Sequence, residues 1–300
     1  GAMNVVNIHG LDTPQVSVTV MFEANYTEVA ETAQSWYVRE QWVLERKRDI
    51  LSPPPEKAKA DHCPRCGAAL QTRTDGACEF CGVKIESGTF HWFVRMLAVV
   101  SAEKRGPLLT SNVPEQGTQR PTIVQPDLDR TPFAELEPRV REVARTLQDA
   151  WTAREWERVR PLETEGLFQM HRYWIDAYVK QKLRNVVDDY AIVRIEPAKY
   201  ATDAFYESMT VRIFASGFDY TIDESGGVVA GSKTQTRSWS EYWTFIRTRA
   251  AASGTMSCPN CGATVEVGTT GICPFCGGKL TAGAFDWVLS SIEQDDAYQC

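Results

Sequence analysis

Residues 63–82 read CPRCGAALQTRTDGACEFCG, and residues 258–277 read CPNCGATVEVGTTGICPFCG. Each stretch holds two Cys-x-x-Cys pairs, and every pair is followed by glycine. Two residues between cysteines let both thiolates point at one ion, and glycine allows the positive φ that turns backbone N–H groups toward the sulfurs. The pattern therefore predicts two structural zinc ribbons, one zinc ion in each, with the ligands Cys63, Cys66, Cys78, Cys81 and Cys258, Cys261, Cys273, Cys276.

Other chemistries fit these cysteines less well. A dithiol redox centre needs one Cys-x-x-Cys pair, whereas two pairs at fixed spacing occur twice here. Iron in a rubredoxin-like site is chemically acceptable, but availability favours zinc. His62 adjoins Cys63 and is surplus to the four thiolates. Four-sulfur ligation leaves no position for a reacting water, so we expect both sites to be structural.

Length and charge limit the function classes. Three hundred residues are enough for two domains, and the formal net charge of −7 argues against a general nucleic-acid binder. No apolar run approaches the ~20 residues that a membrane-spanning helix needs. Eight of nine cysteines have metal spacing, which favours a reducing, cytosol-facing location and leaves Cys300 without a predicted partner.

The first part of the chain is predicted to be a sheet carrying a ribbon. Alternating Val16, Val18 and Val20 indicate a half-buried strand, and another follows around 36–45. We place the first ribbon at 61–86 and a further strand at Phe90, Trp92 and Val94. The first domain spans 4–104. Four prolines without hydrophobic periodicity make 105–131 a proline-rich linker.

The second domain, 132–296, is predicted to be helices followed by an antiparallel sheet, the α+β class. Thr131 is the predicted N-cap of a helix with Pro132 in its first turn. One apolar helix face then follows, a short helix is expected at 154–160, and another helix is expected at 163–183. After them the period changes to two. Strands are expected at 191–195, 209–215, 237–249 and 287–291, with a Ser225-Gly226-Gly227 turn and the second ribbon at 256–281.

The two halves share motifs beyond the cysteines. Glu40-x-Trp42 with Arg46 corresponds to Glu241-x-Trp243 with Arg247, and the halves also share the pairs Thr19-Val20 with Thr210-Val211 and Phe90-x-Trp92 with Phe285-x-Trp287. We therefore predict a tandem repeat, each copy with a ribbon inserted between its last two strands. The first copy lacks a counterpart of the helices. Gly1-Ala2-Met3 looks like an expression scar, so we expect that the sequence was cut within a domain and that the missing upstream part could anchor the protein in a membrane. Without its helices the first sheet would expose an apolar face, so we also expect this domain to self-associate.

Several motifs of the second half carry a family resemblance. They are Gln148-Asp149-Ala150-Trp151, Arg184-Asn185-Val186-Val187-Asp188-Asp189, Asp219-Tyr220-Thr221, Glu241-Tyr242-Trp243-Thr244-Phe245 with Arg247, and Trp287-x-Leu289-x-x-Ile292. In this order they resemble bacterial members of the Tim44-like domain family, which includes the membrane-associated subunit of the mitochondrial import motor. The resemblance covers 132–296 well and 4–97 in part. It implies a cystatin-like or nuclear-transport-factor-two-like fold, with helices on a curved antiparallel sheet and an apolar pocket between them. Nothing in 1–131 matches the chaperone-binding segment of that subunit.

The expected pocket is lined by Leu147, Trp151, Trp239, Glu241 and Trp243. Glu241 shares a strand face with aromatic residues, where a carboxylate can act as an acid or base. The simpler interpretation is a structural pair with an arginine such as Arg212 or Arg247, or an interior polar anchor. Trp151, Trp156 and Trp174 lie at helical positions and are interpreted as core residues rather than as a stack around a cofactor. No Ser/His/Asp or Cys/His arrangement is visible among the four histidines.

We therefore predict a non-enzymatic, zinc-stabilised adaptor that binds a protein, peptide or lipid in its pocket at the cytoplasmic face of a membrane. One alternative is an enzyme that uses the pocket with Glu241 as acid or base. Another is a zinc-ribbon protein that binds nucleic acid, which the net charge disfavours.

Overall fold

The computed structural model describes residues 2–29, 31–51, 62–85, 90–106, 109–110, 121–125, 128, 131–203, 206–249, 255–257, 264–266, 286–295 and 297–298. The chain forms two compact units, Gly1–Pro107 and Leu108–Cys300. Antiparallel sheets and helices are both present, so the predicted α+β class is confirmed.

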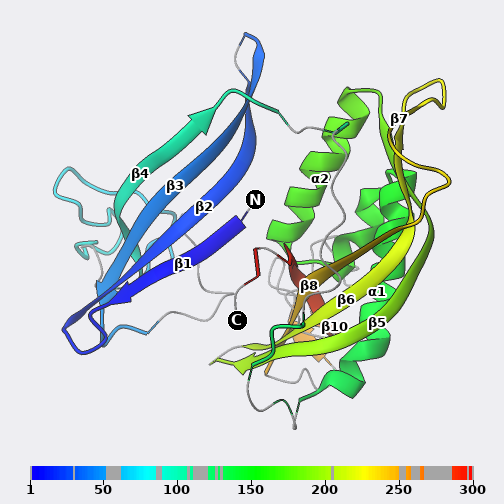
Figure 1. The fold of residues 1–300 in the computed structure, drawn as a ribbon. Helices are drawn as coiled ribbons and strands as arrows, with labels where there is room; N and C mark the ends of the chain where they lie inside the picture. Colours follow the sequence, from blue (N-terminus) through cyan, green and yellow to red (C-terminus); the bar gives the residue numbers. More distant parts are fainter. Residues whose placement is uncertain are drawn as a thin grey trace. The chain divides into compact units, whose positions relative to one another are not determined.

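The first unit is a four-stranded antiparallel sheet in the order β1-β2-β3-β4 (Figure 1). Its strands are β1 (Ala2–His9), β2 (Gln15–Val29), β3 (Ala33–Lys47) and β4 (Phe93–Glu103). Gly10 makes the β1–β2 turn at φ +76°, and a Cβ there would lie 2.2 Å from the carbonyl oxygen of Gln15, so only glycine fits. Val16 and Val20, two of the three alternating valines, are buried. The described part of residues 2–106 contains no helix.

The first cysteine stretch lies in the connection from β3 to β4. These two strands pair with each other, and Trp42 stands opposite Leu97. A chain that leaves β3 through residues 62–85 therefore returns to the same sheet edge. Two irregularities in the register, at Arg39/Glu40 and Val43/Leu44, add local twist to this pair.

Three helices open the second unit: α1 (Phe133–Ala153), the 3₁₀ helix η2 (Trp156–Leu162) and α2 (Glu165–Lys180). The predicted apolar face of α1 is confirmed, because Leu136, Val140, Val143 and Leu147 are all buried. The predicted start was wrong by one residue. Pro132, which lacks a side-chain hydrogen bond to the helix, occupies the N-cap position expected for Thr131.

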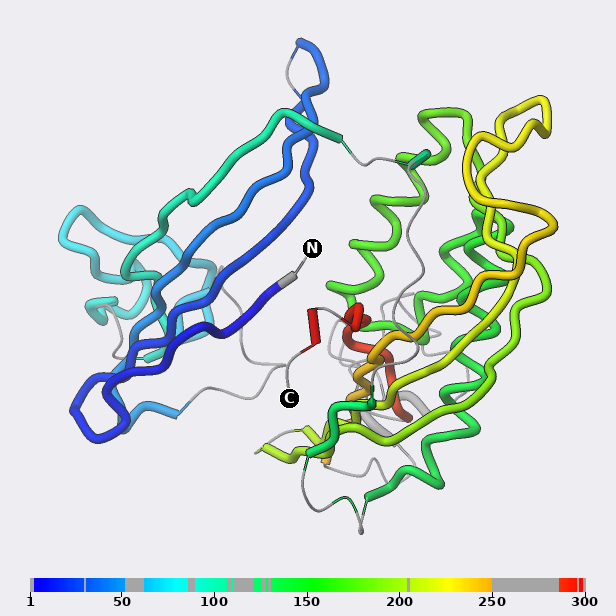
Figure 2. Tube along the Cα trace, in the orientation of Figure 1, coloured from blue at the N-terminus to red at the C-terminus, as the bar shows by residue number. Residues whose placement is uncertain are grey.

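A five-stranded antiparallel sheet follows the helices. It consists of β5 (Arg184–Thr202), β6 (Tyr206–Ile222), β7 (Val228–Gly231), β8 (Arg237–Thr248) and β11 (Val288–Gln294). Its order is β11-β8-β6-β5, and β7 forms the predicted hairpin with β6. The long strands β5 and β6 bend along their length (Figure 2), and three register shifts between them supply the irregularities that bending needs. Two short strands, β9 (Thr255–Ser257) and β10 (Thr264–Glu266), pair separately.

The helices cover one face of this sheet and build the main core with it. Met209, Val211 and Ile213 of β6 and Trp243 and Phe245 of β8 are almost fully buried in that core. In the sequence these apolar residues recur at every second position, which predicted one buried face of each strand. The structure shows that this face packs against α1 and α2. Trp287 and Leu289 of the last strand complete the cluster.

The other face of β6 buries a charge. Arg212 has a side chain only 1% exposed, and its Nη2 lies 2.6 Å from Oδ2 of Asp295. Ser240 accepts from the same nitrogen at 3.1 Å and donates to Asp295 at 2.7 Å. The guanidinium also packs over the ring of Phe214 at 4.5 Å. A buried pair of this kind needs additional hydrogen bonds, and here Ser240 bonds to both partners.

Part of the proline-rich segment predicted as a linker belongs to this buried face. The backbone N–H of Ile123 donates to the hydroxyl of Tyr242 at 2.9 Å, and that of Gln125 donates to the carbonyl of Ala198 at 2.8 Å. Residues 121–125 therefore lie on the sheet of the second unit. Proline content correctly indicated the lack of regular structure but did not show these contacts.

The two sheets place equivalent motif residues in the same register. In each sheet the tryptophan of Glu-x-Trp is paired with one apolar residue on each neighbouring strand. Trp42 lies between Val20 and Leu97, and Trp243 lies between Val211 and Ile292. The indole N–H of Trp42 donates to Glu40 at 2.9 Å, and that of Trp243 donates to Glu241 at 3.1 Å.

The arginine that follows each Glu-x-Trp motif makes the same kind of contact in both sheets. The guanidinium of Arg46 lies 4.6 Å from the ring centroid of Trp92, and that of Arg247 lies 4.6 Å from that of Trp287. Each arginine therefore covers the tryptophan that enters the last strand of its own sheet.

We predict that Asp295→Ala destabilises the protein by about 3–5 kcal/mol, because it leaves the Arg212 guanidinium buried without its anion. Urea unfolding followed by intrinsic fluorescence measures this. Glu224→Ala is the matched control. It removes the partner of Lys182 from a pair in which both side chains are about 70% exposed, so it should cost less than about 1 kcal/mol. Equal losses in the two variants would contradict a structural role for the buried pair.

Candidate metal centre and ligand cavity

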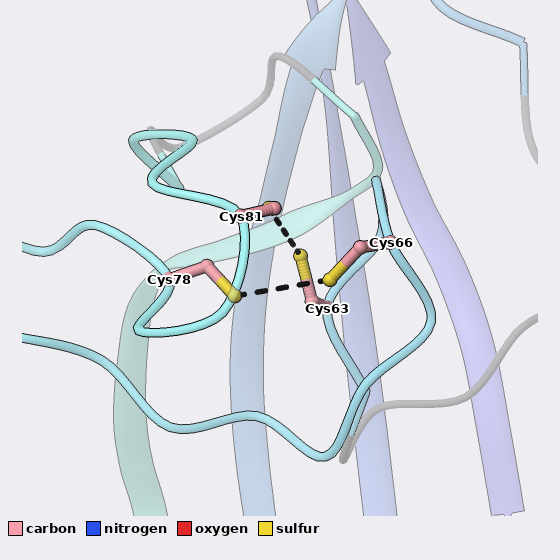
Figure 3. Close-up of side chains that lie close together, drawn as sticks. All are labelled: Cys63, Cys66, Cys78 and Cys81. Atoms are coloured by element: carbon pink, nitrogen blue, oxygen red, sulfur yellow. Dashed lines mark hydrogen bonds between the residues drawn. The ribbon is translucent and has the colours of Figure 1, made fainter.

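Four sulfur atoms of the first unit converge on one point. The Sγ atoms of Cys63, Cys66, Cys78 and Cys81 all lie within 4.8 Å of one another. Figure 3 shows them entering from two facing loops, and the paired sulfurs are 3.8 Å and 3.9 Å apart. A tetrahedral site with metal–sulfur bonds of about 2.3 Å requires sulfur separations of about 3.8 Å. The cluster therefore fits a tetrahedral metal ion.

The backbone of both loops has the form that the glycines predicted. Gly67 and Gly82 have φ values of +73° and +67°. Their N–H groups donate to the carbonyl oxygens of Cys63 at 2.8 Å and Cys78 at 2.9 Å, which closes each loop around its two thiols. A side chain at either position would strain the left-handed backbone, so the glycine after each cysteine pair serves the site directly.

The thiols are unequal. The backbone N–H of Cys66 lowers the pKa of the Cys63 thiol to about 6, despite the opposing effect of burial. The backbone N–H of Ala68 acts in the same direction on Cys66, but burial and the neighbouring sulfurs raise the pKa of that thiol to about 11. One thiolate crowded by three other sulfurs is a donor set for a soft or borderline cation.

The second set of cysteines, Cys258, Cys261, Cys273 and Cys276, lies outside the described residues. The backbone on both sides of its first pair is described, since Ser257 stands opposite Thr264 in the β9–β10 pair. When the two cysteine stretches are aligned, this bridge coincides with the His62–Ala69 bridge around the first pair of the first set.

A cavity of about 440 Å³ opens between the helices and the sheet of the second unit. Four of the five residues expected to line a pocket lie in its wall: Leu147, Trp151, Glu241 and Trp243. The other described lining residues are Gln148, Trp156, Met170, His171, Trp174, Tyr178, Ile292 and Gln294. The volume falls in the usual range of small-ligand sites, and most of the wall is apolar or aromatic.

The structure places Trp239 outside this lining. It shares the sheet face of Glu241 and Trp243 but contacts Tyr190 of β5, with ring centroids 6.0 Å apart. Trp239 and Trp243 are four positions apart on the strand, which corresponds to about 13 Å. The alternation of side chains along β8 therefore identified the face on which Trp239 lies, but it could not show how far along the strand the cavity extends.

Glu241 has partners other than those expected from the sequence. Its Oε2 accepts from the indole N–H of Trp243 at 3.1 Å, and its Oε1 accepts from Nε2 of Gln294 at 2.8 Å. The predicted structural pair with an arginine is wrong, because Arg212 pairs with Asp295 on the opposite face and Arg247 pairs with Glu207 and Glu135. Glu241 is thus a hydrogen-bonded carboxylate in the cavity wall.

Sequence reasoning missed a histidine–carboxylate pair at the same cavity. His171 Nδ1 lies 2.8 Å from Oε1 of Glu163, whose side chain is fully buried. Trp156 packs edge-on to this histidine with ring centroids 5.0 Å apart. Glu163 precedes α2 and His171 lies two turns inside it. Only the fold of the chain before the helix brings them together.

The three tryptophans interpreted as core residues also line the cavity. Trp156 is buried in the main core, and Trp151 and Trp174 are partly buried. Helical spacing identified the side of the helix on which they lie. It could not distinguish a packed core from the wall of a hollow in it.

Residues 120–256 match the Tim44-like domain family. The match extends from the segment beside Ile123 through the helices to the end of β8, and it contains Trp151, Glu241 and Trp243. The resemblance drawn from sequence motifs is supported over this part of the chain. No curated protein matches the chain. Among the helices in the described part, none combines the length and apolar character needed to cross a membrane.

The Tim44-like match and the cavity concern the same unit, whereas the described four-cysteine cluster belongs to the other one. The match ends at residue 256, before β11. Ile292 and Gln294 of that strand nevertheless help to line the cavity. The cavity is therefore built by the Tim44-like region together with the strand that follows the second cysteine stretch.

We predict that untreated protein contains two zinc ions per chain, and that the double variant Cys63→Ser, Cys78→Ser retains one. These two thiols are the buried members of the first cluster, so their loss should abolish four-sulfur ligation there. Elemental analysis by plasma mass spectrometry measures zinc and iron together. Cys300→Ser is the control and should leave the zinc content unchanged. Less than one zinc per chain in untreated wild-type protein, or iron in its place, would contradict the prediction.

Proposed function

We propose that this protein is a non-catalytic, zinc-stabilised binding or adaptor module that holds an apolar ligand, from a protein, peptide or lipid, in the cavity of its second unit. The observation that carries the proposal is the cavity wall itself, in which Leu147, Met170 and Ile292 join five aromatic side chains. An apolar hollow with a few hydrogen-bonded polar groups suits recognition of an apolar group in a fixed orientation. The Tim44-like match agrees with a binding role.

The proposal treats the two units as a tandem repeat with a zinc ribbon before the last strand of each. Matching strand register, matching Glu-x-Trp hydrogen bonds and matching arginine–tryptophan contacts support the repeat. The coincident backbone bridges around the first cysteine pairs support a second ribbon like the first. Helices on a bent antiparallel sheet agree with a cystatin-like or nuclear-transport-factor-two-like unit. In this proposal both zinc ions are structural, and each supplies roughly 10–16 kcal/mol of folding free energy to its ribbon.

We further propose peripheral association with the cytoplasmic face of a membrane and self-association through the first unit. Its outer strands β1 and β4 expose many apolar side chains: Met3, Val5, Val6, Ile8, Val94, Met96, Leu97, Val99 and Val100. Exposed apolar edge strands invite pairing or coverage by another chain. This feature supports an assembly role for the first unit beside a ligand-binding role for the second.

One observation favours the enzymatic alternative. Glu163 and His171 form a hydrogen-bonded pair beside the same cavity that Glu241 lines. A carboxylate-oriented histidine is a recurrent general base, and a second carboxylate could act as the acid. We prefer the binding role because the oxygens of Glu241 accept hydrogen bonds from Trp243 and Gln294, which gives this carboxylate a structural purpose.

We predict that the neutral apolar fluorophore N-phenyl-1-naphthylamine binds the cavity and that Met170→Glu weakens it at least tenfold, because the variant places a charge in an apolar wall. Fluorescence titration measures the affinity. Val179→Glu is the matched control. It adds the same charge to the same helix at a side chain that is 52% exposed and lies outside the cavity lining. Equal effects of the two variants, or no binding by the wild type, would contradict the proposal.

We also predict that the protein leaves every compound of a soluble metabolite extract unchanged over a day, as followed by proton NMR. The binding role requires no chemistry. Disappearance of a metabolite that stops in Glu241→Gln, with an unchanged unfolding curve, would instead establish the enzymatic alternative.

A further inference from the structure

The described wall of the cavity contains a carboxylate and no lysine or arginine, which an apolar ligand alone does not explain. Among the described residues that line it, none is lysine or arginine, and Glu241 supplies the carboxylate. His171 is the one basic side chain in that set. Its Nδ1 lies 2.8 Å from the fully buried side chain of Glu163, so a carboxyl group stands directly behind the imidazole. The wall around the hollow therefore favours a positive charge.

Aromatic rings surround the same space. Trp151, Trp156, Trp174, Tyr178 and Trp243 all belong to the lining. The ring of Trp151 stands nearly perpendicular to that of Trp156, at 86°, and to that of Tyr178, at 83°. The rings of each pair are in edge-to-face contact, with centroids 5.8 Å apart, and the contacting rings lie in different planes; we call these five lining rings the aromatic box. The negative faces of such rings attract a cation that has given up its water.

The fixed hydrogen bonds of Glu241 indicate which cation is suited. Each oxygen of its carboxylate accepts one hydrogen bond, from Trp243 or from Gln294, so about two of its four acceptor sites remain. A primary ammonium brings three donors, more than these sites can accept, and loses strong hydration on entry. An alkylated ammonium brings few or no donors, has an apolar surface and needs only a nearby negative charge and ring faces.

The indole of Trp151 shows that one ring of this box is held in place. Its N–H donates to Oδ1 of Asn185 at 2.8 Å, and Nδ2 of that asparagine donates in turn to Asp219 at 2.9 Å. A ring fixed at its nitrogen edge from outside the cavity keeps its orientation whether or not a ligand is present. Such preorganisation lowers the entropic cost of binding.

We infer that the cavity recognises a small ligand through an alkylated ammonium group, with the aromatic box around the charge and Glu241 as the counter-ion. This inference rests on the proposed ligand-binding function and specifies the chemical class of the ligand. A cavity of about 440 Å³ has room for a choline-sized group with a short apolar extension.

The test compares choline with its neutral carbon isostere, 3,3-dimethylbutan-1-ol, by calorimetric titration of the full chain at constant ionic strength. We expect choline to bind at least tenfold more tightly than the isostere, since the two differ in charge and share their shape. Glu241→Gln should reduce this affinity ratio at least fivefold. Asp176→Asn is the control. It makes the same charge change on α2 at a side chain that is 72% exposed, and it should leave the ratio unchanged.

A second variant keeps the inference testable if Glu241→Gln fails to fold. Trp174→Leu removes one half-buried ring of the box and should lower the choline affinity at least threefold, whereas Trp174→Phe should restore most of it. Equal affinities of choline and the isostere would overturn the inference. Binding of N-phenyl-1-naphthylamine without binding of choline would overturn the inference and leave the proposed function standing. Failure of both probes to bind would overturn both.

Discussion

The second unit depends on the fact that its central strand β6 is buried on both faces. An antiparallel sheet normally keeps one face in water, but here residues from Met209 to Ala215 are all buried. Helices cover the apolar face. The opposite face contains Arg212, which must find an anion and further acceptors because an unpaired buried charge is unstable. Asp295 and the segment at 121–125 therefore have to return to the sheet. This constraint places the chain beyond residue 256 in the same folded unit, although the family match stops there.

Successive side chains of β8 point to opposite faces of the sheet, which separates the residues around Arg212 from those that line the cavity. Ser240 and Tyr242 face the buried arginine, whereas Glu241 and Trp243 face the helices. The carboxylate is thus kept away from the guanidinium by the strand itself, and the two charges have separate partners. Glu241 can line the hollow on one face without an arginine partner because the positive charge of Arg212 on the other face is already paired with Asp295.

The sequence was most informative where a short period or a fixed spacing expresses a single local constraint. The apolar face of α1 and the alternation of β6 predicted burial correctly, and the glycines after the cysteines predicted the loop backbone. It was uninformative where partners come from distant segments. The pairing of His171 with Glu163 and that of Arg212 with Asp295 depend on how the chain returns to the sheet. Trp239 shows an intermediate case, since a period of two identifies a face but gives no position along the strand.

The Glu-x-Trp hydrogen bond occurs in both sheets, and this bears on what Glu241 is for. In the first unit Trp42 donates to Glu40, although the described part of that unit has no helices to enclose a cavity. In both units the bond satisfies an indole N–H beside a carboxylate on one strand face. In the second unit the same bond lies at the cavity between the helices and the sheet, so ligand recognition by Glu241 is compatible with this structural role. Because Glu241 already accepts two hydrogen bonds, it keeps fewer acceptor sites than a primary ammonium has donors, and it suits a ligand that offers charge.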